Sequence, residues 1–154
     1  YGGTDNTDNS GSISYLVINY AGAQINSESQ YNGLTLYAVG SGTTIENVAI
    51  LNGTDDGVEF FGSAVNASNF YLENNEDDAV DWTEGWNGTL TNTYVLHSVA
   101  GFSTAVEADG VDGADGEAGA KGGAQLAGEA QQQRRLADVG VADEADRRRC
   151  SREC

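Results

Sequence analysis

Hydrophobic residues recur between residues 11 and 110 as short triplets, separated by stretches rich in Gly, Asn, Asp and Ser. One series comprises "LVI" at 16–18, "VAI" at 48–50, "FYL" at 70–72 and "YVL" at 94–96. A second series comprises "LTL" at 34–36, "VEF" at 58–60, "VDW" at 80–82 and "VEA" at 106–108. Within each series the triplets recur every 22 to 32 residues, and the two series alternate. Triplets this short, with many β-branched and aromatic residues, predict strands and not helices.

The clearest internal repeat is "GTDDGVEFFG" at 53–62 and "NEDDAVDWTEG" at 75–85. A shift of 22 residues aligns Asp55 and Asp56 with Asp77 and Asp78. Short strands that repeat at such a period are typical of a solenoid, in which the corresponding strands of successive coils stack as parallel sheets. We therefore expect an all-β parallel β-helix of about four coils.

Several longer phrases carry a family resemblance: "YGGTDNTDNSGSISYLVINYAG", "NGLTLYAVGSGTTIENV", "DDGVEFFG" and "DWTEGWNG". They resemble the right-handed parallel β-helices of the pectate-lyase-like superfamily, and more closely a β-helical domain of secreted or cell-surface bacterial proteins. The resemblance covers roughly residues 1–110. It implies a right-handed β-helix, an extracellular or cell-surface location in a bacterium, and further coils or neighbouring domains in a parent protein. It implies no single activity.

The second series alternates regularly between apolar and polar residues, so one face of its sheet should point into the core and the other into solvent. The inward residues are Leu34, Leu36, Val58, Phe60, Val80 and Trp82. The outward residues are Thr35, Glu59, Asp81 and Glu107. The outer face of this sheet is therefore expected to be wet and acidic.

The first series has apolar residues at its middle positions as well, namely Val17, Ala49, Tyr71 and Val95. Both sides of this sheet should then be hydrophobic, and we expect its outer side to be covered. The candidates are the loop 22–32, a neighbouring domain or a partner, and coverage by the protein's own chain is the favoured interpretation.

Charge narrows the choice of partners. The formal net charge is −17, and residues 1–120 contain eighteen acids and no Lys or Arg. Such a surface repels the phosphate backbone of nucleic acids and anionic lipids, and it repels polyanionic sugars unless cations intervene. Nucleic acid is thus an unsuitable partner and cations are the first to consider. No run of about 18 apolar residues predicts a membrane span.

Residues 111–154 differ from the rest in composition. Aromatic residues end at Phe102, and Gly110 to Gly122 follow a period of three without proline, which does not predict a stable collagen helix. We expect a domain over 1–110 and a low-complexity tail over 111–154 that is disordered or marginally helical. Cys150 and Cys154 lie too far from the core for a disulfide framework. Because the sequence has no Met, it is interpreted as a fragment or processed form, with any export signal upstream.

The stacked acids suggest a metal site. Like charges near 5 Å apart on consecutive rungs cost about 3 kcal/mol per pair at an effective dielectric of 20. The side chains can splay into water, hold a proton or share a divalent cation. Oxygen ligands from flexible turns suit calcium better than zinc or copper. A calcium site and a solvated acidic face both stay open. The candidate ligands are Asp55, Asp56, Glu59, Asp77, Asp78, Asp81 and Glu107.

Catalysis draws on the same residues. Hydrolases of the superfamily use several aspartates as acid and base, which makes Asp56, Asp78 and Asp81 weak catalytic candidates. The lyases add a Lys or Arg that the predicted domain does not contain. His97, in "VLHSV", ends a strand of the other series and is interpreted as structural. The balance favours a role that is not enzymatic.

Aromatic residues near the ends of the acidic strands offer stacking surfaces for sugar rings, although they could equally close the core. These residues are Tyr37, Phe61 and Trp86. The leading hypothesis is an extracellular or cell-surface module for adhesion or carbohydrate binding, assisted by calcium, whose partner is a polysaccharide or cell-surface glycan. The alternatives are a polysaccharide hydrolase or lyase and a structural spacer.

Overall fold

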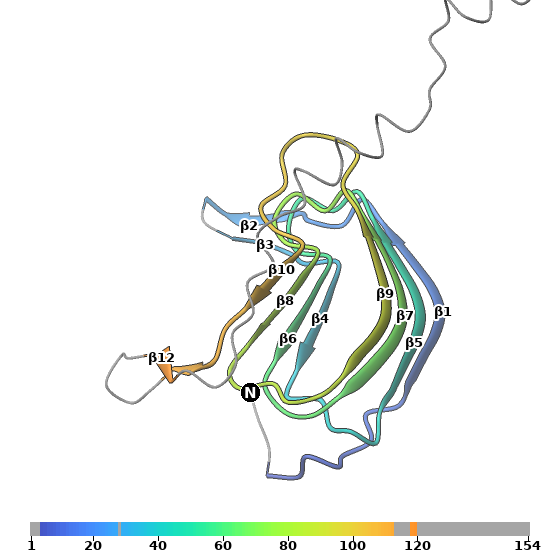
Figure 1. Ribbon diagram of the computed structural model, residues 1–154, viewed down its shortest axis with the longest axis vertical. Helices are drawn as coiled ribbons and strands as arrows, with labels where there is room; N and C mark the ends of the chain where they lie inside the picture. Colours follow the sequence, from blue (N-terminus) through green and yellow to red (C-terminus); the bar gives the residue numbers. More distant parts are fainter. Residues whose placement is uncertain (1–3, 28, 113–117, 120–154) are drawn as a thin grey trace, which may run out of the picture.

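The protein is an all-β parallel solenoid (Figure 1). The computed structural model describes residues 4–27, 29–112 and 118–119. The long-strand sheet has the order β1-β5-β7-β9 and consists of β1 (Ser12–Asn19), β5 (Thr44–Leu51), β7 (Asn66–Glu73) and β9 (Leu90–Leu96). The acidic sheet has the order β10-β8-β6-β4 and consists of β4 (Leu34–Tyr37), β6 (Val58–Phe61), β8 (Val80–Thr83) and β10 (Val106–Ala108). All pairings within these two sheets are parallel.

The chain alternates between the two sheets, so each coil contributes one long and one short strand (Figure 1). From the first rung to the last it completes about three turns, which confirms the predicted parallel β-helix. Two antiparallel hairpins stand outside the stack. They pair β2 (Gln24–Asn26) with β3 (Ser29–Gln30), and β11 (Val111–Asp112) with β12 (Ala118–Gly119).

The core lies between the two sheets and is built from stacked rows of equivalent side chains. In the long-strand sheet, Leu16, Val48 and Phe70 occupy neighbouring rungs of one inward row. In the acidic sheet, Val58 and Phe60 are fully buried, and the other predicted inward residues are buried or packed against the core. The prediction of the inward face of the acidic sheet is therefore confirmed.

An asparagine ladder bends the long strands. Asn47, Asn69 and Asn92 occupy equivalent positions and have φ angles of 55°, 58° and 54°. Asparagine tolerates this left-handed region better than most residues because its short side chain bonds locally. Here the side chains bond along the stack: Asn69 Nδ2 donates to Asn47 Oδ1 at 3.0 Å, and Asn92 Nδ2 donates to Asn69 Oδ1 at 2.6 Å. On the first rung Tyr15 takes the position, with φ 56°.

The predicted register of the last long strand is wrong by one residue. Tyr94, and not Val95, aligns with Tyr71 on the outer face, and Val95 aligns with Leu72 and packs against the core. The reason is the asparagine ladder. It aligns Asn92 with Asn69, and the next inward position then falls on Thr93, which the hydrophobic triplet did not include.

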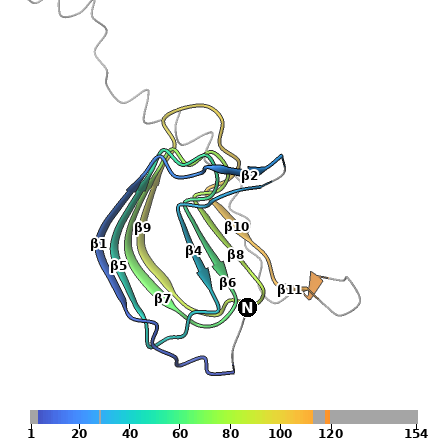
Figure 2. The same cartoon turned by 180° about the vertical axis from the view of Figure 1, so that it is seen from behind.

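The outer face of the long-strand sheet is not covered by the described part of the chain. The side chains of Val17 and Tyr94 are 65% and 56% exposed. Loop 22–32, one of the candidates for covering this face, does not lie over it, because most of that loop forms the β2–β3 hairpin, which projects near the start of β4 (Figures 1 and 2). Tyr71 and Tyr94 lie on this face as a stacked pair, with ring centroids 5.7 Å apart.

The predicted tail, residues 111–154, lies outside the described residues except for the four that form β11 and β12. The prediction that it is disordered or marginally helical stays a prediction.

Replacement of Asn69 tests the ladder, because Asn69 has ladder partners on both sides. We expect Asn69→Ala to destabilise the fold by about 2–3 kcal/mol, since it removes two hydrogen bonds and places Ala in the left-handed region. Asn69→Gly removes the same bonds but tolerates the backbone, so its cost should be about 1 kcal/mol lower. Urea unfolding of both variants measures the difference, and equal costs would contradict a role for the backbone conformation.

Candidate functional site

Three acidic side chains form one row across the outer face of the acidic sheet. Glu59 of β6 pairs with Asp81 of β8, and Asp81 pairs with Glu107 of β10. Thr35 of β4 completes the row at its other end. The predicted stacking of Glu59, Asp81 and Glu107 on consecutive rungs is thus confirmed. Glu59 and Asp81 are half-buried, so the face is less wet than expected.

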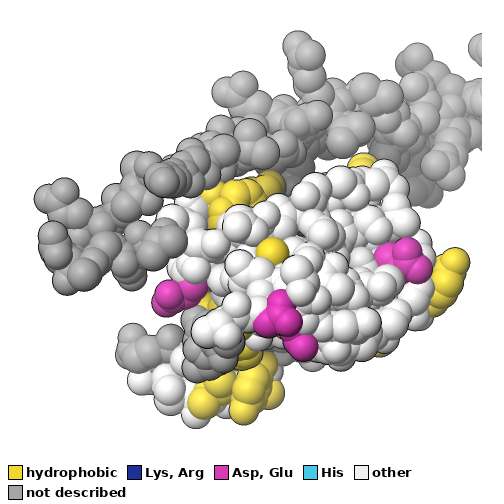
Figure 3. All heavy atoms as spheres, turned by 90° about the horizontal axis from the view of Figure 1, so that it is seen from below, with side chains coloured by type: hydrophobic (Ala, Val, Ile, Leu, Met, Phe, Trp, Pro, Cys, Tyr) yellow, Lys and Arg dark blue, Asp and Glu magenta, His cyan; other side chains and the backbone are white. Residues whose placement is uncertain are grey.

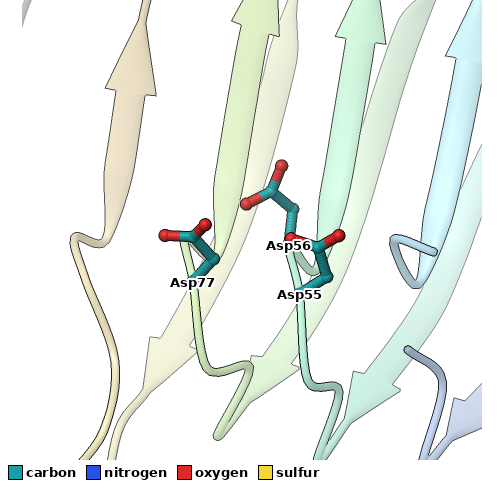
Figure 4. A group of neighbouring side chains, drawn as sticks. All are labelled: Asp55, Asp56 and Asp77. Carbon is teal, nitrogen blue, oxygen red and sulfur yellow. The ribbon is translucent and has the colours of Figure 1, made fainter. Parts of the chain in front are cut away.

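The paired aspartates lie on the turns that lead into β6 and β8, as Figure 4 shows for Asp55, Asp56 and Asp77. Asp55 is half-buried and Asp77 is exposed, whereas Asp56 and Asp78 are buried. Each buried aspartate accepts a backbone hydrogen bond from the next coil. Asp56 Oδ1 accepts the Asp78 backbone N–H at 3.0 Å, and Asp78 Oδ1 accepts the Thr104 backbone N–H at 2.6 Å. The second aspartate of each pair therefore joins two coils.

The glycine after the first pair also has a structural reason. A Cβ atom on Gly57 would lie 2.5 Å from the carbonyl oxygen of Ala79 on the next coil, closer than atoms pack. The turns approach one another this closely because Gly57 N–H donates to Asp78 O, and Val58 N–H donates to Ala79 O. The repeated Asp-Asp-Gly and Asp-Asp-Ala sequences thus form equivalent turns on successive coils, and these turns pack against each other.

The structure brings five of the seven predicted metal ligands into two groups that share Asp56. The turn group is Asp55, Asp56 and Asp77, and the carboxyl cluster is Asp56, Glu59 and Asp81. Within each group, one oxygen of each residue lies within 4.8 Å of the others. Calcium takes oxygen ligands at about 2.3–2.6 Å, so two ligands of one ion can be up to about 5 Å apart. Either group could hold such an ion. Asp78 and Glu107 belong to neither group.

Burial makes the carboxyl cluster resist full ionisation. It is the largest cause that raises the pKa of Asp56 to about 8 and that of Asp81 to about 7, and it also raises the pKa of Glu59. The hydrogen bond between Glu59 and Asp81 raises the pKa of Asp81 further and lowers that of Glu59, whereas the surrounding negative charges raise both. For Glu107, the hydrogen bond to Asp78 is the largest cause of a pKa of about 7. Without a cation, the cluster therefore retains protons near neutral pH.

One oxygen of the carboxyl cluster is particularly suited to coordinate a metal ion. Among the described residues, Asp81 Oδ1 is buried and has no hydrogen-bond partner. An unsatisfied buried oxygen is costly, and a bound cation would satisfy it. The cluster thus fits calcium by its all-oxygen donor set and by this atom.

Two polar residues around the cluster were missed by sequence reasoning. Asn32 Nδ2 donates to Glu59 Oε2, and Thr104 Oγ1 donates to Asp78 Oδ1 at 2.7 Å. Asn32 and Thr104 occupy the positions that Asp56 and Asp78 hold on the middle coils, because each of the four lies two residues before one of the paired strand residues Leu34, Val58, Val80 and Val106. Their position two residues before the predicted strands at 34 and 106 could have identified them, but neither residue belongs to an Asp-Asp pair.

The predicted aromatic residues separate into two environments. Tyr37 and Phe61 are paired on the outer face of the acidic sheet, two residues beyond Thr35 and Glu59, with ring centroids 4.6 Å apart. Trp86 is half-buried instead: it stacks on Phe60 at 4.4 Å, and its Nε1 donates to Val65 O at 3.1 Å. Tyr37 and Phe61 therefore lie beside the acidic row, whereas Trp86 packs against the core.

His97 lies outside both acidic groups. Its ring is 3% exposed and stacks on Phe102 with centroids 4.1 Å apart. This placement agrees with the structural interpretation of His97.

Comparison with known protein families gives one match. The sequence matches the family model of the pectate-lyase-like β-helix domain over residues 1–142. The chain belongs to this family. The β-helix domain matches no curated protein and no solved structure. The family match extends beyond residue 110, where the predicted domain ended.

The described residues of the β-helix domain include no helix long and apolar enough to cross a membrane. They also include no Lys or Arg, since the first basic residue of the sequence is Lys121. The catalytic candidates Asp56 and Asp81 meet in the carboxyl cluster. Asp78 is not part of the cluster and accepts a hydrogen bond from the backbone N–H of Thr104.

The raised pKa values predict that stability falls as pH rises. Asp56, Asp81 and Glu107 bind protons more tightly in the folded than in the unfolded chain, so their contribution is complete below pH about 4 and is lost toward pH 8. In EDTA, we expect the melting temperature to decrease between pH 5 and pH 8. Asp56→Asn should flatten this dependence, because the amide does not titrate.

Glu84→Gln is the matched control, since Glu84 is exposed and lies outside both acidic groups. It should leave the pH dependence of the melting temperature unchanged. A melting temperature that increases over this pH interval would contradict the burial of the carboxyl cluster.

Proposed function

We propose that the β-helix domain is a carbohydrate-binding module for adhesion in an extracellular or cell-surface bacterial protein, with calcium bound at the acidic sheet. The observation that carries this proposal is the in-register row of Glu59, Asp81 and Glu107 beside the aromatic pair Tyr37 and Phe61. Acidic side chains that can hold a cation and aromatic rings that can stack on a sugar lie on one sheet face, and this combination suits a glycan bound through a cation.

The carboxyl cluster would hold the calcium ion. Asp56, Glu59 and Asp81 supply carboxylate oxygens, and the turn group adds Asp55 and Asp77 on the neighbouring edge. Calcium accepts six to eight oxygens, so an ion held by these residues retains positions for ligand oxygens. It would also neutralise the acidic face, which otherwise repels uronic acids and other anionic sugars.

The aromatic pair supplies an apolar surface at a suitable separation. Tyr37 lies two residues beyond Thr35, and Phe61 two residues beyond Glu59, a distance of about 7 Å along a strand. Tyr37 is 53% exposed, so its ring is accessible to a sugar. Sugar rings have apolar faces that stack on aromatic side chains, and a saccharide could contact the ring and the cation together.

The hairpins support an elongated ligand on this face. β2–β3 and β11–β12 project from opposite ends of the acidic sheet and toward the same side of the solenoid (Figures 1 and 2). A ligand on the sheet between them would cross several rungs. Solenoid faces of this kind are used for extended ligands in other repeat proteins.

A hydrolase is the second candidate, and the raised pKa values of Asp56 and Asp81 favour it because a general acid must be protonated near neutral pH. The spacing argues against an inverting hydrolase in particular. Inverting hydrolases separate their carboxyl groups by about 6.5–9.5 Å to admit a water. The carboxyl cluster places oxygens within 4.8 Å, which suits a shared proton or cation.

Calcium should raise the melting temperature. At a calcium concentration tenfold above Kd, binding to the folded state adds about 1.4 kcal/mol, which corresponds to several degrees for a domain of this size. We expect Glu59→Gln with Asp81→Asn to abolish the calcium-induced shift in a thermal melt.

Glu76→Gln with Glu84→Gln removes the same charge from exposed positions and should retain the shift. Loss of the shift in both double variants would mean that calcium responds only to net charge. No shift in the unaltered protein would refute the calcium site.

Glycan binding should depend on Tyr37. We expect Tyr37→Ala to weaken retardation of the protein in gels containing pectin or alginate by about tenfold, because stacking contributes about 1 kcal/mol or more. EDTA should weaken it as well. Tyr31→Ala, which alters an exposed tyrosine on the hairpin side, is the control. Shortened polysaccharide products would favour the hydrolase, and a chain that binds neither calcium nor glycan would be a spacer.

A further inference from the structure

A second polar surface lies on the long-strand sheet, remote in the fold from the acidic row. A groove of about 490 Å³ crosses the first halves of β5, β7 and β9. We call it the hydroxyl groove because most of its lining side chains are Thr, Ser or Asn. The lining residues are Thr43, Thr44, Ile45, Glu46, Asn66, Ala67, Ser68, Thr89 and Thr91.

The groove repeats from rung to rung. Thr44 pairs with Asn66, and the Ala67 N–H donates to Thr89 O, so these three side chains form one row. Glu46, Ser68 and Thr91 form a second row two residues further along the strands. Rungs in a parallel sheet are about 4.8 Å apart and alternate residues about 6.6 Å apart. The side chains thus present hydrogen-bonding groups at regular intervals along the solenoid.

The floor of the groove is buried, and its polar side chain is hydrogen-bonded. Ile45 and Ala67 are each 3% exposed, and the buried Thr43 uses its Oγ1 to accept the Ser10 backbone N–H at 2.8 Å. The exposed Thr44, Asn66, Thr89 and Thr91 lie above this floor. Short side chains on a stacked sheet lose little conformational freedom on binding, so a ligand would meet a preorganised surface.

The negative charge of the groove disfavours anionic ligands. Glu46 is its one ionisable lining residue, and Ser14 Oγ donates to Glu46 Oε1 at 3.3 Å. A single carboxylate among hydroxyls and amides offers no charge partner to a phosphate, a sulfate or a uronic acid, and it repels all three. Figure 3 shows the molecule from the side on which β5, β7 and β9 begin, where the described surface carries acidic and no basic side chains.

A tyrosine pair extends the same face. Tyr71 and Tyr94 follow Ser68 and Thr91 by three residues, beyond the asparagine ladder. Their rings are nearly parallel, with an interplanar angle of 3°, and are 36% and 56% exposed. Hydroxyl, amide and aromatic groups are the donors, acceptors and apolar faces that an uncharged sugar requires.

We infer that the hydroxyl groove binds an uncharged oligosaccharide that lies across β5, β7 and β9 without calcium. The ligand hydroxyls exchange hydrogen bonds with Thr44, Asn66, Ser68, Thr89 and Thr91. This site differs from the calcium-dependent site of the proposed function in sheet, charge and ligand class, so either can fail while the other holds.

The test is a titration of the 15N-labelled full chain in EDTA with cellohexaose, xylohexaose and mannohexaose, followed by amide chemical shifts. We expect at least one of them to shift the amides of residues 44–46, 66–68 and 89–91, while those of Glu59, Asp81 and Glu107 stay unchanged. Trigalacturonate should shift none of these amides in EDTA, because Glu46 repels it.

The double variant Thr89→Val with Thr91→Val preserves side-chain shape and removes two hydroxyls, so it should weaken binding about tenfold, as for two modest hydrogen bonds. Thr35→Val on the acidic sheet is the matched control and should bind as the unaltered protein does. The inference is overturned if none of the three neutral hexasaccharides shifts the groove amides. It is also overturned if the double variant binds normally, or if the shifts fall on the acidic sheet.

Discussion

Parallel stacking in register is the constraint on which the rest of this structure depends. Each strand of the solenoid bonds to the equivalent strand of the next coil, so a residue at a given position meets its own counterpart about 4.8 Å away. The path of one coil is then repeated by the next, corners included. Positive φ angles recur at Asn47, Asn69 and Asn92, and again at Tyr20, Asn52 and Asn74 where the long strands end. A local preference of one residue becomes a property of the whole stack.

The same constraint multiplies both favourable and unfavourable contacts. Amide side chains carry a donor and an acceptor, so Asn47, Asn69 and Asn92 bond in sequence along the stack. Carboxylates carry acceptors only when ionised, and the row of Glu59, Asp81 and Glu107 can form no such chain unless protons or cations join it. Burial is the largest cause of the raised pKa of Asp81, and the hydrogen bond to Asp78 is the largest cause for Glu107; repulsion along the row of acids adds to both.

Sequence reasoning located the elements that periodicity governs and missed those that turn chemistry governs. The triplets at 34–36, 58–60, 80–82 and 106–108 became strands in the predicted register, because inward apolar residues flank an outward polar residue in each of them. Tyr94 and Val95 were misassigned because the register there follows Asn92, and an asparagine on a strand carries no hydrophobic signal. Asn32 and Thr104 were missed for a related reason: they complete the aspartate stack from coils whose own turns do not repeat the Asp-Asp phrase. The hydroxyl groove could not be read from the sequence either, since Ser and Thr at these spacings are common on any exposed strand.

Asp56 shows how the structural and the functional roles of an acid can coincide. Its Oδ1 accepts a backbone N–H of the next coil, which orients the carboxyl group and places it under the protein surface. That burial raises its pKa to about 8 and brings it within 4.8 Å of Glu59 and Asp81. If the only role of residue 56 were to cap the turn, Asn would serve as well as Asp, because Asn keeps the acceptor oxygen and does not titrate. Asp at position 56 therefore costs stability near neutral pH that Asn would not, and a bound cation would recover that cost because it favours the ionised form. The chemistry of Asp56 thus connects the bond between coils to the proposed ion site.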